Sequence, residues 1–362
     1  MLFAIRPALE PSKVFDGLNR LLREVMLAAL EGRAADPNVL PVGLHAAVDG
    51  NQATRDAVTR LWAALVGLDQ GRRTALRDEL LLNREPCDFL TDRALPVPTI
   101  PDVVFSHLKT LSVHLYERTA KLVGVEVACG ECIDDHCARF RAAAEPGNGN
   151  VCCVCGTDYL AQIRAGVDDN EQWRGPYDHL LAKDEYPLFG VHPGNLLPIC
   201  HTCNSKAKLA KDLLRKNGLR RLSFSPWTES ALPTEIQVTI DDTDVFPRVV
   251  VELQGSTADR QEKLDTWNEV YKIKERVEGE FLALREKVGE DVTSDSEAGF
   301  MTGLEQRALA KAGACRVSPF NFWRARVYRA VQVMDQASRE ALRQAIQQAT
   351  PSAQAMEDLF FN

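Results

Sequence analysis

The sequence has no uninterrupted apolar run of the roughly 18 to 20 residues that a membrane span requires. Residues 1–13 are broken by charged residues and prolines, so they cannot form the core of a signal peptide. We therefore expect a cytoplasmic protein. The sequence also lacks internal repeats and low-complexity tracts. With 362 residues, of which 45% are hydrophobic and 26% charged, the chain is long enough for two or three ordinary globular domains.

Cysteine and positive charge are both scarce over the chain as a whole. The ten cysteines are too sparse for a disulfide scaffold, and most of them fall between Cys129 and Cys203, where their spacing points to metal. A net charge of -8 excludes a protein coated in basic residues for wrapping DNA. Locally the sign reverses, because residues 206–221 carry seven lysines and arginines against the single acid Asp212.

The hydrophobic pattern predicts a mainly helical α+β protein in three parts. Residues 1–145 form a helical N-terminal region, 146–222 a central region, and 223–362 a hairpin followed by helices. Ser12 is the expected N-cap of the first helix and Gly32 its stop. The remaining expectations are helical patterns over 54–82, 102–123, 256–288, 303–312 and 319–348, a proline-rich linker over 84–101, and strands at 236–240 and 249–253.

Two Cys-x-x-Cys pairs bracket the central region. Cys152 with Cys155 and Cys200 with Cys203 each form the tight turn that points two sulfurs at one ion. Two such turns facing each other predict a structural zinc site. Cys153 is an alternative ligand to Cys152, although the x-x spacing favours Cys152, and four unrelated buried cysteines are the other alternative.

A second group of metal-ligand types precedes these pairs. Cys129-x-x-Cys132 is followed by His136 and Cys137. Four ligands within nine residues are sterically tight, so both a second zinc and a loop with partly buried thiols stay open.

The segment between the cysteine pairs carries an ordered motif. It reads Asp-His at 178–179, a lysine at 183, Tyr-Pro at 186–187, Asn-Leu-Leu-Pro-Ile-Cys at 195–200 and Cys-Asn-Ser-Lys at 203–206. This string resembles the HNH endonuclease family, and most closely its bacterial subgroup with Asn-Leu-x-Pro-x-Cys-x-x-Cys-Asn-x-x-Lys. The resemblance covers about residues 152–211. Ala207 and Lys208 depart from it, because a lysine commonly follows Ser-Lys directly.

The resemblance implies a ββα-metal fold around a hydrolytic Mg²⁺ or Mn²⁺ centre. His179 suits a general base because its ordinary pKa near 6.5 leaves it largely neutral at cytosolic pH. Asp178 points to the opposite side of an extended strand, and the resemblance assigns it to the metal. Asn204 stands at the last motif position, where an amide oxygen is a hard Mg²⁺ ligand, although a helix N-cap is the plainer reading. Asn195 is expected to pin its loop and orient the His179 ring.

Other residues near the motif have weaker expectations. His192 could approach the site from its loop. A helix from about Asn204 to Asn217, stopped by Gly218, would carry basic residues along one side for contacts with DNA phosphates; a solvated helix face is the alternative. The phosphate-binding candidates are Lys206, Lys208, Lys211 and Arg215, with Lys183 a weaker one.

The combined expectation is a zinc-stabilised HNH nuclease that cleaves DNA and leaves 5′-phosphate and 3′-hydroxyl ends, as the resemblance implies. Nucleases of this subgroup often serve bacterial defence, so by analogy the flanking regions would sense a signal or bind a partner such as an ATPase. Two rivals stay open: a non-catalytic zinc-ribbon binding module, and an interaction protein with a vestigial nuclease core.

Overall fold

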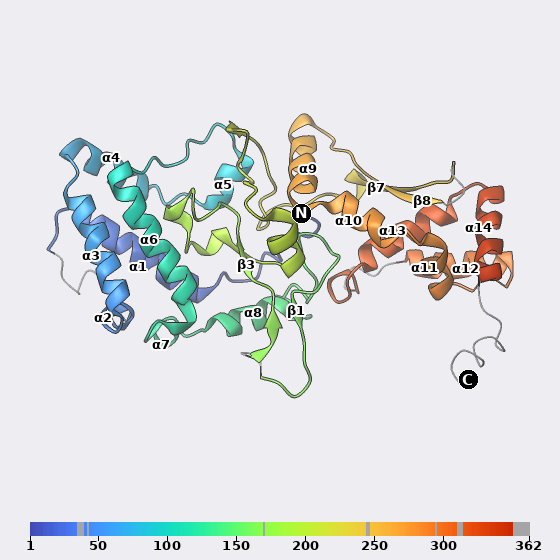
Figure 1. The fold of residues 1–362 in the computed structure, drawn as a ribbon, viewed down its shortest axis with the longest axis horizontal. Helices are drawn as coiled ribbons and strands as arrows, with labels where there is room; N and C mark the ends of the chain where they lie inside the picture. Colours follow the sequence, from blue (N-terminus) through green and yellow to red (C-terminus); the bar gives the residue numbers. More distant parts are fainter. Residues whose placement is uncertain are drawn as a thin grey trace.

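The computed structural model describes residues 1–34, 40–41, 43–168, 171–243, 247–293, 295–309 and 314–349. It is a mainly helical α+β fold with four two-stranded sheets in these residues. Within the same ranges, no helix is long and apolar enough to cross a membrane. The elements are arranged along one long axis, with the N-terminal helices at one end, the C-terminal helices at the other and strand β3 between them (Figure 1).

The N-terminal region is built around α1, Lys13–Leu30, which is buried along most of its length. The Ser12 side chain accepts a hydrogen bond from the Phe15 N–H, so the predicted N-cap is confirmed. α1 packs against three of the other helices here, α3, α4 and α7. The region also contains α2 (His45–Asp49), α3 (Gln52–Val66), α4 (Gln70–Leu81), α5 (Pro86–Thr91), α6 (Asp102–Arg118), η2 (Thr119–Lys121), α7 (Val125–Cys129) and α8 (Ile133–Arg141).

Two N-terminal expectations need correction. The amphipathic run over 54–82 is two helices, because Gly67 ends α3 and the Asp69 side chain caps α4 by accepting from the Arg72 N–H. The proline-rich stretch 84–101 is not extended throughout, since Pro86 starts the short helix α5. Proline fits the first turn of a helix, where its missing N–H would have no partner.

The central region contains the strand pair predicted around the motif. β3 (Tyr177–His179) runs antiparallel to β4 (Leu196–Pro198), with Asp178 opposite Leu197 and His179 opposite Leu196. The connection between them includes η4 (Pro187–Phe189) and η5 (Pro193–Asn195). A second small pair, β1 (Ala161–Gln162) with β2 (Trp173–Arg174), precedes it.

The predicted helix over 204–217 is wrong in its length. The helical segment η6, Cys203–Lys208, is a π-helix that stops at Leu209, which has a positive φ of 51°. The chain then forms a hairpin of β5 (Arg215–Lys216) and β6 (Leu219–Arg220). The basic residues of this stretch therefore do not form one helical face.

The C-terminal region begins with the predicted hairpin, β7 (Ile236–Asp241) and β8 (Arg248–Leu253), preceded by η7 (Pro233–Glu235). The single helix expected over 256–288 is three helices, because Lys272 adopts a left-handed conformation with φ of 57° and a turn follows at 281–283. These are α9 (Ala258–Tyr271), α10 (Ile273–Glu280) and α11 (Leu284–Asp291).

The last helices close the C-terminal region. α12 (Glu297–Ala308) starts before the predicted 303 and ends at Ala308; part of the predicted range lies outside the described residues. The expected helix over 319–348 is interrupted between α13 (Asn321–Gln332) and α14 (Gln336–Ala349), and η8 (Ala314–Arg316) precedes it. α13 packs on β7 and α12.

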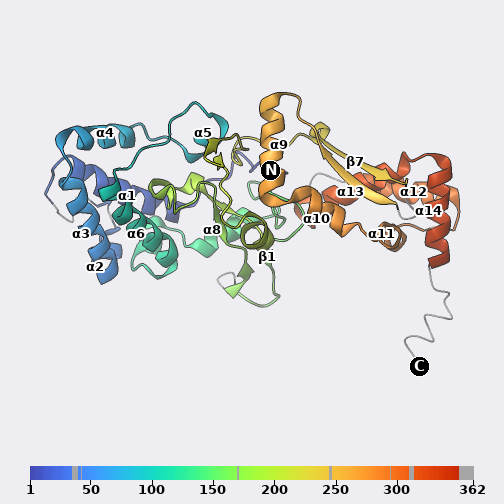
Figure 2. The ribbon, with the colours of Figure 1, turned by 45° about the horizontal axis from the view of Figure 1, so that its top comes forward.

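The beginning of the chain lies in the middle of the molecule, beside α9 (Figures 1 and 2). The backbone N–H groups of Leu2 and Phe3 donate to the Cys153 carbonyl, and the Met1 carbonyl accepts from Ala231. The central region is therefore joined both to the first residues of the chain and to the segment that precedes β7.

Candidate functional site: a four-cysteine cluster beside Asp178 and His179

The two Cys-x-x-Cys pairs meet, as the spacing predicts. The Sγ atoms of Cys152, Cys155, Cys200 and Cys203, here called the four-cysteine cluster, lie within 4.8 Å of one another, and all four residues are buried. Two of the Sγ···Sγ separations are 4.0 Å (Cys152 to Cys203) and 3.8 Å (Cys155 to Cys200). A tetrahedral zinc with sulfur ligands at about 2.3 Å has sulfur–sulfur edges of about 3.8 Å. The cluster can therefore hold a zinc ion.

The first turn of the cluster decides between Cys152 and Cys153. The Gly156 N–H donates to the Cys152 carbonyl at 2.8 Å, and Gly156 has a φ of +68°, which glycine adopts without strain. This turn brings Cys152 and Cys155 together and leaves Cys153 outside the cluster, where burial raises the pKa of its thiol. Cys152, and not Cys153, therefore belongs to the group of four cysteines that could hold an ion.

Residues of the C-terminal region surround the cluster. The Arg276 guanidinium of α10 donates to Cys203 Sγ at 3.2 Å, to Cys155 Sγ at 3.5 Å and to Thr157 Oγ1 at 2.5 Å. Trp267 of α9 and Trp323 of α13 donate their indole N–H groups to the carbonyls of Val154 and Cys155, at 2.9 and 2.8 Å. Although burial opposes it, the neighbouring thiolates raise the pKa of Arg276. The sequence gives no local signal for these contacts.

The second cysteine group does not form a metal site. Among the residues that the structure describes, the four-cysteine cluster is the only group of His, Cys, Asp and Glu residues placed to hold an ion. Cys132 instead caps α8 by accepting from the Asp135 N–H. His136 Nδ1 and Cys137 Sγ both contact the Tyr177 hydroxyl. Of the two open readings, partly buried thiols are the one that the structure supports.

His179 lies at the end of β3 in a well-defined hydrogen bond. Its Nε2 lies 2.9 Å from the Gly190 carbonyl, and a carbonyl only accepts, so Nε2 carries the proton and Nδ1 keeps a free lone pair. The ring packs edge-on against Tyr116, with centroids 4.4 Å apart. Burial lowers the pKa of His179 to about 3, and the charges of Lys183 and Lys208 add to this shift. The imidazole is therefore neutral at pH 7.

Asp178, next to His179, is buried and has partners on both carboxylate oxygens. Lys208 Nζ lies 2.6 Å from Oδ1, and the Tyr271 hydroxyl of α9 donates to Oδ2 at 3.2 Å. Lys208 Nζ also donates to the His179 carbonyl. Asp178 and Lys208 are each only 4% exposed. The Lys208 ammonium therefore neutralises Asp178 inside the protein, and the expectation that Lys208 lies on an exposed helix face is wrong.

Two asparagines of the motif have different surroundings. Asn195 is fully buried and pins the loop: its Nδ2 donates to the carbonyls of Leu181 and Phe189, and its Oδ1 accepts from the Leu181 N–H. Asn195 was also expected to orient the His179 ring. This part of the expectation is wrong, because the ring is hydrogen-bonded to the Gly190 carbonyl and not to Asn195.

Asn204 is half-buried inside η6, whose N-cap is Thr202, so it is not a capping residue. Within the described part of the chain its side-chain amide has no hydrogen-bond partner. Carboxylate and amide oxygens are the donors that Mg²⁺ and Mn²⁺ prefer, so the donor types of Asp178 and Asn204 fit such an ion. The position on Asp178 Oδ1 is taken by Lys208 Nζ.

The remaining basic candidates fall into two groups. Lys211 Nζ donates to the Ala207 carbonyl at 2.7 Å and reaches the carbonyls of Glu269 and Val270, and Lys183 pairs with Glu117 at 3.1 Å. Lys206 and Arg215 are exposed, and neither has an ion-pair or hydrogen-bond partner in the described ranges. Lys206 and Arg215 are therefore unpaired surface cations within the described residues.

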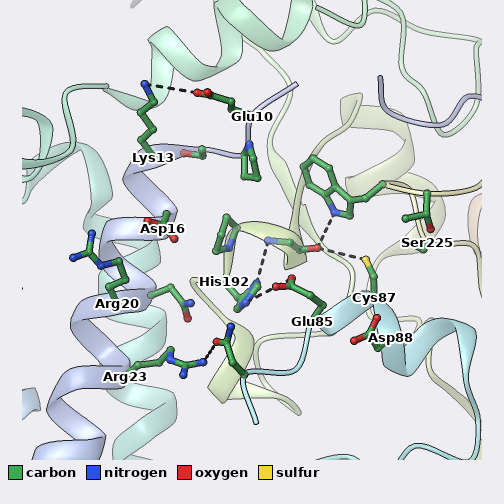
Figure 3. Close-up of a pocket in the computed structure, with 18 of the residues that line it drawn as sticks. Glu10, Lys13, Asp16, Arg20, Arg23, Glu85, Cys87, Asp88, His192 and Ser225 are labelled. Atoms are coloured by element: carbon green, nitrogen blue, oxygen red, sulfur yellow. Dashed lines mark hydrogen bonds and ion pairs between the residues drawn. The ribbon is translucent and has the colours of Figure 1, made fainter. Parts of the chain in front are cut away.

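His192 lines a cavity of about 1040 Å³ whose lining does not include His179. Its Nδ1 accepts from the Gly194 N–H at 3.1 Å, and its Nε2 faces Glu85 Oε2 at 3.8 Å. Arg20 and Arg23 of α1 line the same cavity (Figure 3). Trp227 and Cys87 close the wall by donating to the Gly194 carbonyl. The contacts of His192 therefore belong to this cavity and give no support to an approach to His179 from its loop.

Comparison of the chain with protein-family models, with curated proteins and with solved structures finds no match.

Proposed function

We propose that the chain is a metal-dependent endonuclease of the HNH type that hydrolyses phosphodiester bonds in DNA. The observation that carries the proposal is the His179 ring, held through Nε2 by the Gly190 carbonyl so that Nδ1 is free to accept a proton. Asp178 precedes it on β3, and η6, with the unbonded Asn204 amide, follows the second cysteine pair. The hydrogen-bond geometry and these neighbours support the motif assignment made from the sequence.

In this proposal each residue has one task. His179 Nδ1 takes the proton of the attacking water, while the Gly190 carbonyl fixes the ring. A divalent ion at Asp178 and Asn204 would stabilise charge on the phosphate and the leaving oxygen. Asn195 holds the loop 180–189 in place, and Lys206 and Arg215 contact the DNA backbone. Zinc in the four-cysteine cluster would fix the distance between β3 and η6.

The proposal is tested by nicking of supercoiled plasmid in Mg²⁺ or Mn²⁺. We expect His179→Ala to lose about 100-fold or more of the rate, because a positioned general base contributes that much. His201→Ala is the matched control, since His201 is an exposed histidine of the same region. Equal nicking by the wild type and His179→Ala would remove His179 from the mechanism.

Two observations favour a second candidate, a zinc-containing binding module without catalysis. Both oxygens of Asp178 already have partners inside the protein, and burial lowers the pKa of His179 to about 3, below the range that suits a base at neutral pH. If DNA binds but no nicking occurs in either metal, with the zinc present, this second candidate is the better description.

A further inference from the structure

The ion pair between Lys208 and Asp178 lies where the proposed function needs a metal ion. Lys208 belongs to a segment whose neighbours Lys206 and Leu209 are exposed, yet its own side chain turns inward and is buried. A lysine on a surface segment ordinarily keeps its ammonium in water, because removing the charge from water is costly. The interior must therefore offer the ammonium strong partners, and it does, in Asp178 Oδ1 and the His179 carbonyl.

The backbone around Lys208 is built to direct this side chain inward. The Leu209 N–H donates to the Asn204 carbonyl at 3.1 Å, a bond across five residues that widens η6 into a π-helix. Leu209, directly after it, has a φ of 51° and a ψ of -123°, a conformation that a leucine rarely adopts. The same turn carries Asn204 at its second residue and Lys208 at its last, so a return to α-helical pitch would rotate Lys208 relative to Asn204.

The C-terminal region supports this arrangement from the other side. Tyr271, the last residue of α9, donates to Asp178 Oδ2 and is buried. Lys211 Nζ lies 3.4 Å from the carbonyls of Glu269 and Val270 on the same helix. Asp178 therefore has no carboxylate oxygen without a partner, and the segment that carries Lys208 is tied to α9.

We propose that Lys208 Nζ occupies the cation position of this site at rest, and that a divalent ion binds Asp178 only by displacing it. The inference rests on the proposed function, because that function places the ion at Asp178. The ammonium and the ion compete for Oδ1, so the protein as folded here is the closed form of the site. Entry of the ion moves Lys208 out of the interior and requires the π-helical turn to rearrange.

The first test measures Mn²⁺ binding by electron paramagnetic resonance on zinc-loaded full-length protein. We expect Lys208→Gln to bind Mn²⁺ at least about tenfold more tightly than the wild type, because a unit positive charge beside Asp178 is removed. Asp178→Asn in the Lys208→Gln background should abolish the gain. Lys211→Gln is the matched control, because this lysine bonds to backbone carbonyls and not to Asp178. Equal Mn²⁺ affinity in the wild type and Lys208→Gln would overturn the proposal.

A second test needs no variant and so does not depend on the fold of Lys208→Gln. Acetylation of the wild type, followed by mass spectrometry, should leave the buried Lys208 protected without Mn²⁺ and make it reactive in Mn²⁺, with the exposed Lys206 as internal reference. Plasmid nicking is followed in the same solutions. If Lys208 stays protected at Mn²⁺ concentrations that support nicking, the displacement is wrong and the nuclease stands. If Mn²⁺ exposes Lys208 without any nicking, displacement is supported and the nuclease proposal fails.

Discussion

Arg276 offers the sharpest test of how the four-cysteine cluster is stabilised. Its guanidinium donates to two of the four sulfurs and to Thr157, and it approaches from α10, outside the central region. Four thiolates around one zinc carry a net charge of about -2, which a neighbouring cation stabilises. Arg276→Met removes that charge, these three hydrogen bonds and a fourth to the Tyr271 carbonyl at 3.4 Å, while keeping an apolar side chain of intermediate length.

The expected loss of zinc affinity in Arg276→Met follows from these contacts. Loss of an outer partner of metal ligands typically lowers metal affinity about 10- to 100-fold, which corresponds to about 1.4 to 2.8 kcal/mol. With four hydrogen bonds lost, two of them to the sulfurs, Arg276→Met should fall in the upper part of this range. Arg276→Lys should recover only part of the loss, because one ammonium cannot reproduce the two-sulfur fork of a guanidinium.

The assay is competition for zinc with a chromogenic chelator, followed by the thermal midpoint of each variant. Lys274→Met is the control, because Lys274 lies on the same helix and its side chain has no partner in the part of the chain that the structure describes. If Arg276→Met holds zinc as tightly as Lys274→Met, the contacts to Cys203 and Cys155 do not stabilise the metal site and the reasoning fails.

Three further predictions concern the metal, pH and DNA. Cys200→Ser should unfold the central region, because structural zinc sites contribute about 10 to 16 kcal/mol, as much as a whole domain has; metal content and near-UV circular dichroism would reveal a folded, zinc-loaded variant if this is wrong. Burial lowers the pKa of His136 to about 3 and of His192 to about 4, so the unfolded chain binds protons that the folded chain does not as pH falls below about 6.5. The free energy of unfolding, measured by urea denaturation, should therefore be unaffected by these histidines above that pH and should decrease by up to about 2 kcal/mol per histidine at pH 5. His192→Gln should reduce this decrease. His201→Gln, at an exposed position, should leave the decrease unchanged. Lys206→Gln and Arg215→Gln should each weaken DNA binding and reduce its salt slope by about one, while Lys211→Gln should change neither; identical slopes in all three variants would contradict the assignment.

Local sequence signals predicted the parts of this structure that depend on short spacing. The turn at Cys152–Cys155 follows from x-x spacing and the glycine after it, all within a few residues, whereas the strands β3 and β4 were implied by the resemblance of the motif. The α1 cap is equally local, because Ser12 satisfies an N–H only three residues away.

The parts that the sequence did not predict depend on residues far apart in the chain. Arg276 reaches Cys203 across a separation of 73 residues, and Tyr271 reaches Asp178 across 93. A helix from about Asn204 to Asn217 would place Lys208 on an exposed basic face, but Asp178 and the His179 carbonyl bind its ammonium in the interior. Similarly, the basic run after η6 does not form a helix, since Lys216 and Arg221 both pair with Glu269 of α9.

Strand β3 is held from both ends of the molecule. From the N-terminal helices, the Tyr116 hydroxyl donates to the Tyr177 carbonyl at 3.1 Å, and His136 and Cys137 of α8 contact the Tyr177 hydroxyl. From the C-terminal side, Tyr271 holds the neighbouring Asp178. A fragment of residues 146–222 would lose all of these partners, so the central region is not a detachable unit although its motif is continuous in sequence. Because Tyr116 also packs on the His179 ring, both flanks contact the two adjacent residues Asp178 and His179 directly, and a displacement of either flank would change their positions.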